Sequence, residues 1–172
     1  MRLISVSLGS NIDREHHLRG CLDALAETFG ALRVSRVFES EPVGFEDGRN
    51  FYNLVVLFES DWMVGELQAW CKRLEVAHGR RPDSLKFSPR TLDIDLLTVD
   101  DLVGMHDGVG LPRDEILHHA FVLQPLAELL PAGKHPGLGL TYAELWADFE
   151  AGDQRLWPVS FTWAGRQLSP TA

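Results

Sequence analysis

The sequence predicts an α+β domain with a ferredoxin-like core, built from strands and helices in the order β-α-β-β-α-β. Three observations support this fold class: four short apolar runs, two stretches with apolar residues at helical spacing, and the order in which the two kinds alternate. Such a core has an antiparallel sheet with its helices on one face. No linker or repeat divides the 172 residues, so a single domain over 1–172 is expected.

The first half of the core is predicted within residues 3–58. The apolar run 3–8 is expected to be a strand that ends at the turn Gly9-Ser10-Asn11. A helix follows, because apolar residues then recur every three or four positions until Gly30. Residues 32–39 alternate apolar and polar side chains, which is typical of a strand exposed on one side, and residues 51–58 read as a buried strand.

The second half repeats this pattern and is followed by less regular sequence. Apolar residues at helical spacing from Val64 to Ala77 predict the second core helix. The basic, proline-containing stretch 80–91 is expected to be a loop, and 92–99 (LDIDLLTV) the fourth strand. Beyond residue 100 we expect two C-terminal helices and a possible terminal hairpin, over the ranges 121–130, 142–149 and 156–168. Pro158 limits that last segment to a sheet edge.

The charge balance excludes some classes of partner. The net charge of -9 argues against broad binding to nucleic acid or to anionic membranes. Four basic residues nevertheless fall within eleven positions: Arg80, Arg81, Lys86 and Arg90. An acidic protein with one basic loop indicates a binder of small anions, and we expect a monomer that acts on small molecules.

Cysteine usage and the N-terminus indicate a cytoplasmic protein. Cys21 and Cys71 each fall within a predicted amphipathic helix, so buried free thiols are favoured over a disulfide. The first residues lack the apolar stretch of a signal peptide, and no apolar run reaches membrane-spanning length.

Asp93 and Asp95 are the most informative pair of polar residues. In a strand they would share one face, with their α-carbons about 7 Å apart. Two carboxylates on an otherwise apolar strand are costly to bury unless a cation pairs with them, and Mg²⁺ prefers such oxygens. Taken alone, the pair is better explained as a solvated strand face. The adjacent Arg80, Lys86 and Arg90 change that balance, because phosphoryl-type transfer needs cations around the transferring group.

The run KFSPRTLDIDLL (86–97) resembles the signature of the 6-hydroxymethyl-7,8-dihydropterin pyrophosphokinases, which act in folate biosynthesis. Three further segments are similar to that family: SLGSN at 7–11, FESEPVG to FYN at 38–53, and HAFVLQPLAEL at 119–129. The resemblance covers roughly residues 3–131. It implies the ferredoxin-like fold and the transfer of pyrophosphate from ATP to the pterin hydroxymethyl group, with release of AMP.

The resemblance also implies roles for individual residues on the ATP side. Asp93 and Asp95 would bind two Mg²⁺ ions that bridge the ATP phosphates. Arg80 and Arg90 would steady the charge that develops during transfer. The residues implied to contact the nucleotide are Glu75, Lys86, Phe87, Arg90, Arg113 and His119.

On the pterin side, a flat polar heterocycle needs aromatic faces and hydrogen-bonding groups at its edge. Phe51 and Phe121 match the family's two stacking rings, and Asn53 matches the amide that reads the pterin edge. Backbone groups around Ser40, Pro42 and Val43 would complete the rim. Without the resemblance, the two phenylalanines would be assigned to the core. Asn53 is harder to assign there, because a buried amide needs partners.

The segment that should close over the ATP phosphates departs from the family pattern. Arg113 stands where the family usually has His, and His119 stands where it commonly has Arg. Arg113 would restore the positive charge with a longer reach. Two alternatives remain open: a divergent paralogue that binds a pterin with weak or no transfer, and a domain whose sheet pairs with a partner chain.

Overall fold

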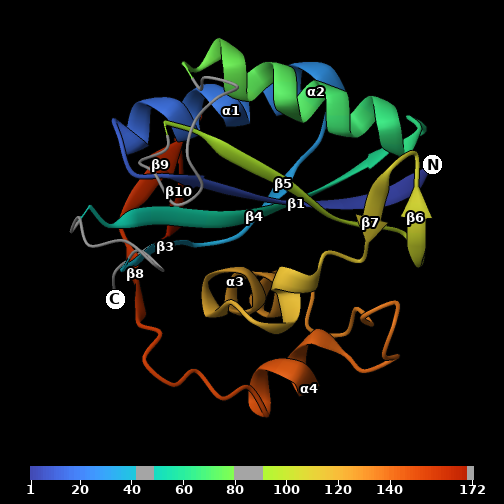
Figure 1. Cartoon of the computed structure of the whole chain (residues 1–172). Coiled ribbons are helices and arrows are strands. Elements are labelled where there is room, and N and C mark those ends of the chain that lie inside the picture. Colours follow the sequence, from blue (N-terminus) through green and yellow to red (C-terminus); the bar gives the residue numbers. More distant parts are fainter. Residues whose placement is uncertain (42–48, 80–90, 170–172) are drawn as a thin grey trace.

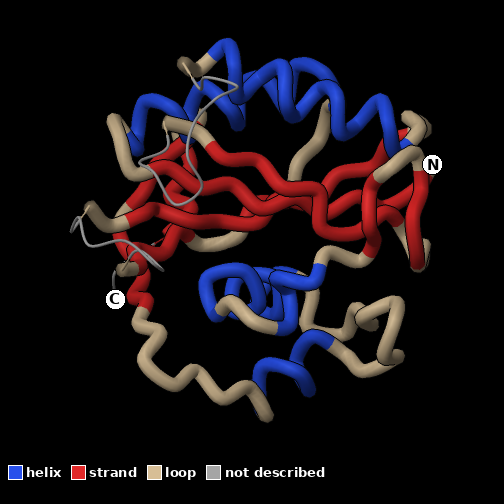
Figure 2. Tube along the Cα trace, viewed as in Figure 1, coloured by secondary structure: helices blue, strands red, loops and turns tan. Residues whose placement is uncertain are grey.

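The computed structural model describes residues 1–41, 49–79 and 91–169 and shows a six-stranded antiparallel sheet between two layers of helices (Figure 1, Figure 2). The sheet has the strand order β5-β1-β4-β3-β8, and the short strand β2 pairs with β4 as well. Its strands are β1 (Arg2–Ser10), β2 (Arg33–Val34), β3 (Val37–Ser40), β4 (Phe51–Ser60), β5 (Asp93–Val99) and β8 (Leu156–Val159). The predicted β-α-β-β-α-β core is therefore confirmed.

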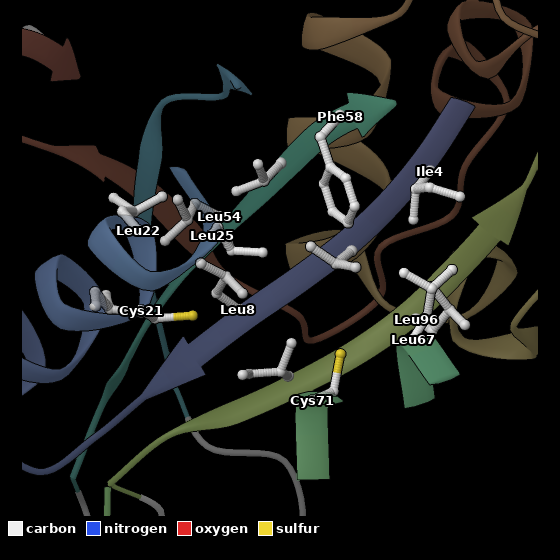
Figure 3. Close-up of a cluster of buried hydrophobic side chains, with 14 of the residues drawn as sticks. Ile4, Leu8, Cys21, Leu22, Leu25, Leu54, Phe58, Leu67, Cys71 and Leu96 are labelled. Atoms are coloured by element: carbon white, nitrogen blue, oxygen red, sulfur yellow. The ribbon is translucent and has the colours of Figure 1, made fainter. Parts of the chain in front are cut away.

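Helices α1 (Arg14–Phe29) and α2 (Val64–Ala77) cover one face of the sheet. Their buried side chains interlock with alternate residues of β1, β4 and β5, as Figure 3 shows for Leu8, Leu54 and Leu96. Both free cysteines, Cys21 and Cys71, lie in this cluster, and burial raises the pKa of the Cys71 thiol to about 12. The expectation that Cys21 and Cys71 are buried free thiols is confirmed.

A second cluster fills the opposite face, under α3 (Ala120–Leu129) and α4 (Tyr142–Ala147). It contains Val55, Leu57 and Leu97 from the strands together with apolar residues of α3. The chain reaches this layer through a hairpin, β6 (Gly104–His106) and β7 (Val109–Leu111), and a 3-10 turn, η1 (Asp114–Leu117). No helix within the described ranges is long and apolar enough to cross a membrane.

Two strand boundaries differ from those that the sequence predicts. β1 continues through Gly9 and Ser10, which pair with Asn53 and Tyr52 of β4, so these residues are not a turn. The range 32–39 forms two strands rather than one. Between them, the Ser35 hydroxyl accepts a hydrogen bond from the Val55 N–H at 2.9 Å, and this side-chain contact interrupts the regular backbone ladder.

The C-terminal segment contributes an edge strand and a separate hairpin. β8, which contains Pro158, pairs with β3 and ends the sheet, as the proline predicts. The hairpin is formed by β9 (Phe161–Trp163) and β10 (Arg166–Ser169). It is anchored to α1, because Arg19 Nε donates to the Thr162 carbonyl at 2.8 Å and the Trp163 indole donates to Asp23 at 2.9 Å.

Candidate active site

Asp93 and Asp95 begin the edge strand β5 and point toward the η1 and α3 side of the sheet. Their neighbours Ile94 and Leu96 point the other way and are buried under α2. The strand alternation that the sequence predicts is thus present, and it places both carboxylates on one face. Only 15% of the Asp95 side chain is exposed, so this is not a solvated strand face.

Arg113 and Glu115 complete a charged network around Asp95. Arg113 Nη2 lies 3.4 Å from Asp95 Oδ1 and donates a hydrogen bond to Glu115 Oε1 at 2.9 Å. Burial, and then the charge of Asp93, raises the pKa of Asp95 to about 7, even though Arg113 acts in the opposite direction. Arg113 thus offsets only part of the effect of burial on Asp95.

The acidic pair can be tested as a metal site on these grounds. Among the described residues, no group of three or more His, Cys, Asp or Glu side chains could hold a metal ion by itself. Mg²⁺ commonly takes only one or two protein carboxylates and completes its shell with water and substrate phosphates. Two carboxylates on one face of a strand, of which Asp95 has a raised pKa, fit that mode of binding.

Glu75 lies on the inner side of α2 against the start of β5. Its side chain is 2% exposed, and Oε2 accepts a hydrogen bond from the Ile94 N–H at 2.8 Å. Lys72 Nζ lies 3.4 Å from Oε1. Glu75 thus supports the backbone between the two aspartates, which places it behind the acidic pair.

A buried amide lies across the sheet from Asp93. Asp93 pairs with Gly9 of β1, and Gly9 pairs in turn with Asn53 of β4, so the three residues form one row. Asn53 is 6% exposed, and its Nδ2 donates to the hydroxyl of Ser40 at 2.7 Å. This bond fixes the amide and leaves Oδ1 to accept from another group.

Gly9 is required by the close approach of these side chains. A Cβ atom at position 9 would lie 3.1 Å from Asn53 Oδ1 and 3.8 Å from the Phe51 ring. Phe51 and Asn53, two positions apart on β4, therefore both lie close to the backbone of Gly9. The sequence predicts only a turn at Gly9, and the strand register reveals this contact.

Phe121 lies in the first turn of α3 and lines a small, partly open pocket. Ser40 lies on the opposite side of the same pocket, so the structure brings together two residues that the sequence assigned to pterin binding. The full lining consists of Ser40, Glu41, Ala120, Phe121, Gln154, Arg155 and Leu156.

His119 precedes Phe121 and packs its ring against it, with centroids 4.8 Å apart. Its Nδ1 lies 3.9 Å from Glu115 Oε2 and, among the described residues, has no hydrogen-bond partner. Burial lowers the pKa of His119, so near pH 7 the ring is mostly neutral. It therefore does not reproduce the charge of the arginine that the family commonly has there.

Six predicted site residues lie outside the described ranges: Pro42, Val43, Arg80, Lys86, Phe87 and Arg90. Two residues of the site were missed. Glu115 could have been suspected, because it lies two positions after Arg113 in the segment that departs from the family pattern. Gln154 gives no signal, since its partners are 34 and 36 residues away in sequence.

The fold and the site define a ferredoxin-like α+β domain whose acidic pair and polar pocket lie near the same end of the sheet. The family model of 7,8-dihydro-6-hydroxymethylpterin-pyrophosphokinase (HPPK) matches residues 5–131. The chain therefore belongs to the HPPK family.

Curated relatives agree with this assignment, and a solved structure shares the fold. The chain is 34% identical to the 2-amino-4-hydroxy-6-hydroxymethyldihydropteridine pyrophosphokinase of Bacillus subtilis, over 72% of this chain and 75% of that protein. For the enzymes of the same name from Pseudomonas aeruginosa and Aquifex aeolicus, the identities are 34% and 31%, over 77% and 79% of this chain and 86% and 85% of theirs. The Plasmodium falciparum HPPK-DHPS structure shares the fold, with a TM-score of 0.63 at 14% identity. The match covers 85% of this chain and 44% of that one.

Proposed function

We propose that this chain transfers pyrophosphate from ATP to the hydroxymethyl group of 6-hydroxymethyl-7,8-dihydropterin, a step of folate biosynthesis. The observation that supports it best is the row Asp93–Gly9–Asn53 across three strands. Asp93 is proposed to belong to the site of the metal-bound triphosphate and Asn53 to the site of the pterin edge, and their common row supports a shared site. An electrophilic phosphate and the accepting hydroxyl could therefore meet within one site.

The reaction requires little covalent chemistry from the protein. The pterin hydroxyl attacks the β-phosphorus of ATP, the bond from that phosphorus to the oxygen shared with the α-phosphate breaks, and AMP leaves. The hydroxyl proton is lost to water. The protein's tasks are alignment and the stabilisation of spreading negative charge.

Asp93 and Asp95 are proposed to hold Mg²⁺, and the family resemblance implies two ions. When bound, the metal would neutralise charge on the phosphate oxygens during transfer. Arg113 is proposed to contact the phosphates, and the distance of 3.4 Å between its Nη2 and Asp95 Oδ1 supports this role. Arg80, Lys86, Phe87 and Arg90 are proposed partners of the nucleotide from sequence alone.

The pterin is proposed to lie between the rings of Phe51 and Phe121. Asn53 would accept from its edge through Oδ1, because Nδ2 is held by Ser40. Pro42 and Val43 remain proposed members of the rim. We further propose that the protein acts as a monomer in the cytoplasm, where its two buried thiols stay reduced.

The decisive experiment mixes the protein with ATP, MgCl2 and 6-hydroxymethyl-7,8-dihydropterin and follows nucleotides by chromatography. The expected result is one AMP per pterin diphosphate formed, with no AMP when Mg²⁺ or the pterin is omitted. ATP that stays intact in the complete mixture would overturn the proposal. Binding of the pterin without AMP release would favour the alternative of a binding protein that lacks transfer.

A further inference from the structure

The C-terminal segment beyond the family match at residues 5–131 touches both sides of the candidate pocket. Figure 1 shows the chain returning from α4 past α3 to β8 at the sheet edge. Three consecutive residues of this return, Gln154, Arg155 and Leu156, line the pocket together with Ser40 and Phe121. One part of the pocket lining is therefore formed by residues outside the segment that the family model matches.

Gln154 is bonded to the start of α3 through both ends of its amide. Its Oε1 accepts from the Ala120 N–H at 2.8 Å, and its Nε2 donates to the His118 carbonyl at 2.9 Å. Because one end must accept and the other must donate, the amide can adopt only one orientation. Its own N–H is held by the Ala151 carbonyl at 3.0 Å.

This bond replaces a missing cap. The first N–H groups of a helix have no partner within the helix, and a side chain at the N-cap usually accepts from one of them. His119 occupies the N-cap of α3 and makes no such bond. Gln154, distant in sequence, supplies the acceptor instead, one residue before Phe121.

The same segment is also fixed to the other side of the pocket. Leu156 pairs with Ser40 in the ladder between β8 and β3, and the Ser40 hydroxyl accepts from Asn53 at 2.7 Å. Only Arg155 separates Gln154 from Leu156. This short stretch therefore sets the spacing between the start of α3 and the strand that holds the buried amide.

We propose that Gln154 is a positioning residue for pterin binding, which sets where Phe121 stands relative to Ser40 and Asn53. The inference rests on the proposed function, because it takes Phe121 as a stacking ring. The ligand class is a flat heterocycle with an amide-like edge. The acidic pair should not depend on Gln154, since Asp95 and Arg113 are held by other contacts, so the loss of affinity should be larger for the pterin than for the nucleotide.

The test compares Gln154→Ala with the unaltered protein and with Gln167→Ala. Gln167 is a matched control in the C-terminal hairpin, where its amide donates to Ser160 at 2.9 Å. Calorimetry should show about a tenfold weaker Kd for the pterin in Gln154→Ala and a Kd for a non-hydrolysable ATP analogue with Mg²⁺ within twofold of wild type. Gln167→Ala should change neither.

A second variant and a second readout keep the outcomes separate. Gln154→Glu retains an acceptor for the Ala120 N–H but loses the donor to His118, so it should fold and show an intermediate pterin Kd. Hydrogen exchange of the backbone amides at 120–122 should accelerate in Gln154→Ala without any ligand. If the unaltered protein binds no pterin, the proposed function fails, while faster exchange would still support the positioning contact. Unchanged pterin affinity in Gln154→Ala, or equal weakening for pterin and ATP analogue, would overturn the inference.

Discussion

The two faces of the sheet are built from the same strands and differ in kind. The face under α1 and α2 is a continuous apolar cluster, to which β5 contributes Ile94 and Leu96. The face under α3 is apolar only in part. From β5 it receives Asp93 and Asp95, and from β4 it receives Asn53 beside Val55.

This difference shows how a small domain separates stability from chemistry. Successive residues of a strand point to opposite faces, so one segment can fill a core and furnish a site. The face under α1 and α2 supplies apolar burial, which is the main source of stability. The polar face bears the cost of buried carboxylates, visible in the raised pKa of Asp95. Substitutions at neighbouring positions should therefore have opposite consequences.

The largest effect is expected for Asp95→Asn. This change removes the charge that would hold Mg²⁺, so AMP release should fall about 1000-fold. Stability should hold or increase slightly, because the variant no longer buries a carboxylate next to Asp93. Steady-state kinetics and thermal unfolding measure the two quantities. Activity within tenfold of wild type would contradict the proposal that the polar face carries the chemistry.

Its counterpart is Leu96→Ala, one position along the same strand. Leu96 is 2% exposed, and truncation leaves a cavity under α2, which should cost about 2–4 kcal/mol of unfolding free energy. Turnover per folded molecule should stay within about threefold. Urea denaturation gives the stability, and a loss of activity without a loss of stability would mean that the two faces are coupled.

A middle-sized effect is expected for Gly9→Ala, which sharpens the comparison within the polar face. The added Cβ would lie 3.1 Å from Asn53 Oδ1 and should shift the amide away from Ser40. Pterin Kd should rise about tenfold, or about 1.4 kcal/mol, with ATP affinity unchanged. Gly110→Ala is the matched control, because its Cβ would meet only Met105 Sδ, at 3.5 Å. Equal effects of the two variants would contradict the role of Gly9.

Much of the fold was predictable because hydrophobic periodicity is local information. The β5 run LDIDLLTV announced both its strand and its two faces, and the helices α1 and α2 followed from spacing. The split between β2 and β3 was not predictable, because it depends on the Ser35 hydroxyl meeting Val55 from a strand twenty residues away.

The candidate site was predictable where its residues lie close together in sequence. It was not predictable where the fold brings distant residues together. Asp93 and Asp95 were singled out because basic residues lie next to them in sequence and the run 86–97 resembles the family signature. Asn53 was singled out through the resemblance and because a buried amide needs partners. The network of Arg113 with Glu115 required the geometry of η1, and the contact of Gln154 with α3 required the path of the C-terminal segment. Propensity and spacing encode neither contact.

The smallest effect is expected at the edge of the face under α1 and α2, where His17 of α1 contacts His78 at the end of α2. Their Nδ1 atoms lie 2.8 Å apart, so one ring donates and the other accepts. Burial lowers the pKa of both, and His16 lowers them further, while Asp13 acts in the opposite direction on His17. Because the folded pKa values of the two histidines lie below the unfolded value of 6.5, the unfolded chain binds more protons at this pair, and the pair's contribution to stability should fall as the pH drops through 6.5. Asp95, whose raised pKa of about 7 makes the folded chain bind the extra proton, contributes in the opposite direction, so the pair's contribution is read as the difference between wild type and variant.

After allowance for solvent screening, this loss should be at most about 1 kcal/mol between pH 7 and pH 5. His78→Gln should flatten the dependence, because a neutral amide can still accept from His17 and does not titrate. His106→Gln, on the β6–β7 hairpin, is the control and should leave the slope unchanged. Urea denaturation at half-unit pH steps measures it. A slope identical to that of wild type in His78→Gln would contradict the contribution of this pair, and the polar face with its charged network would be the first region to examine.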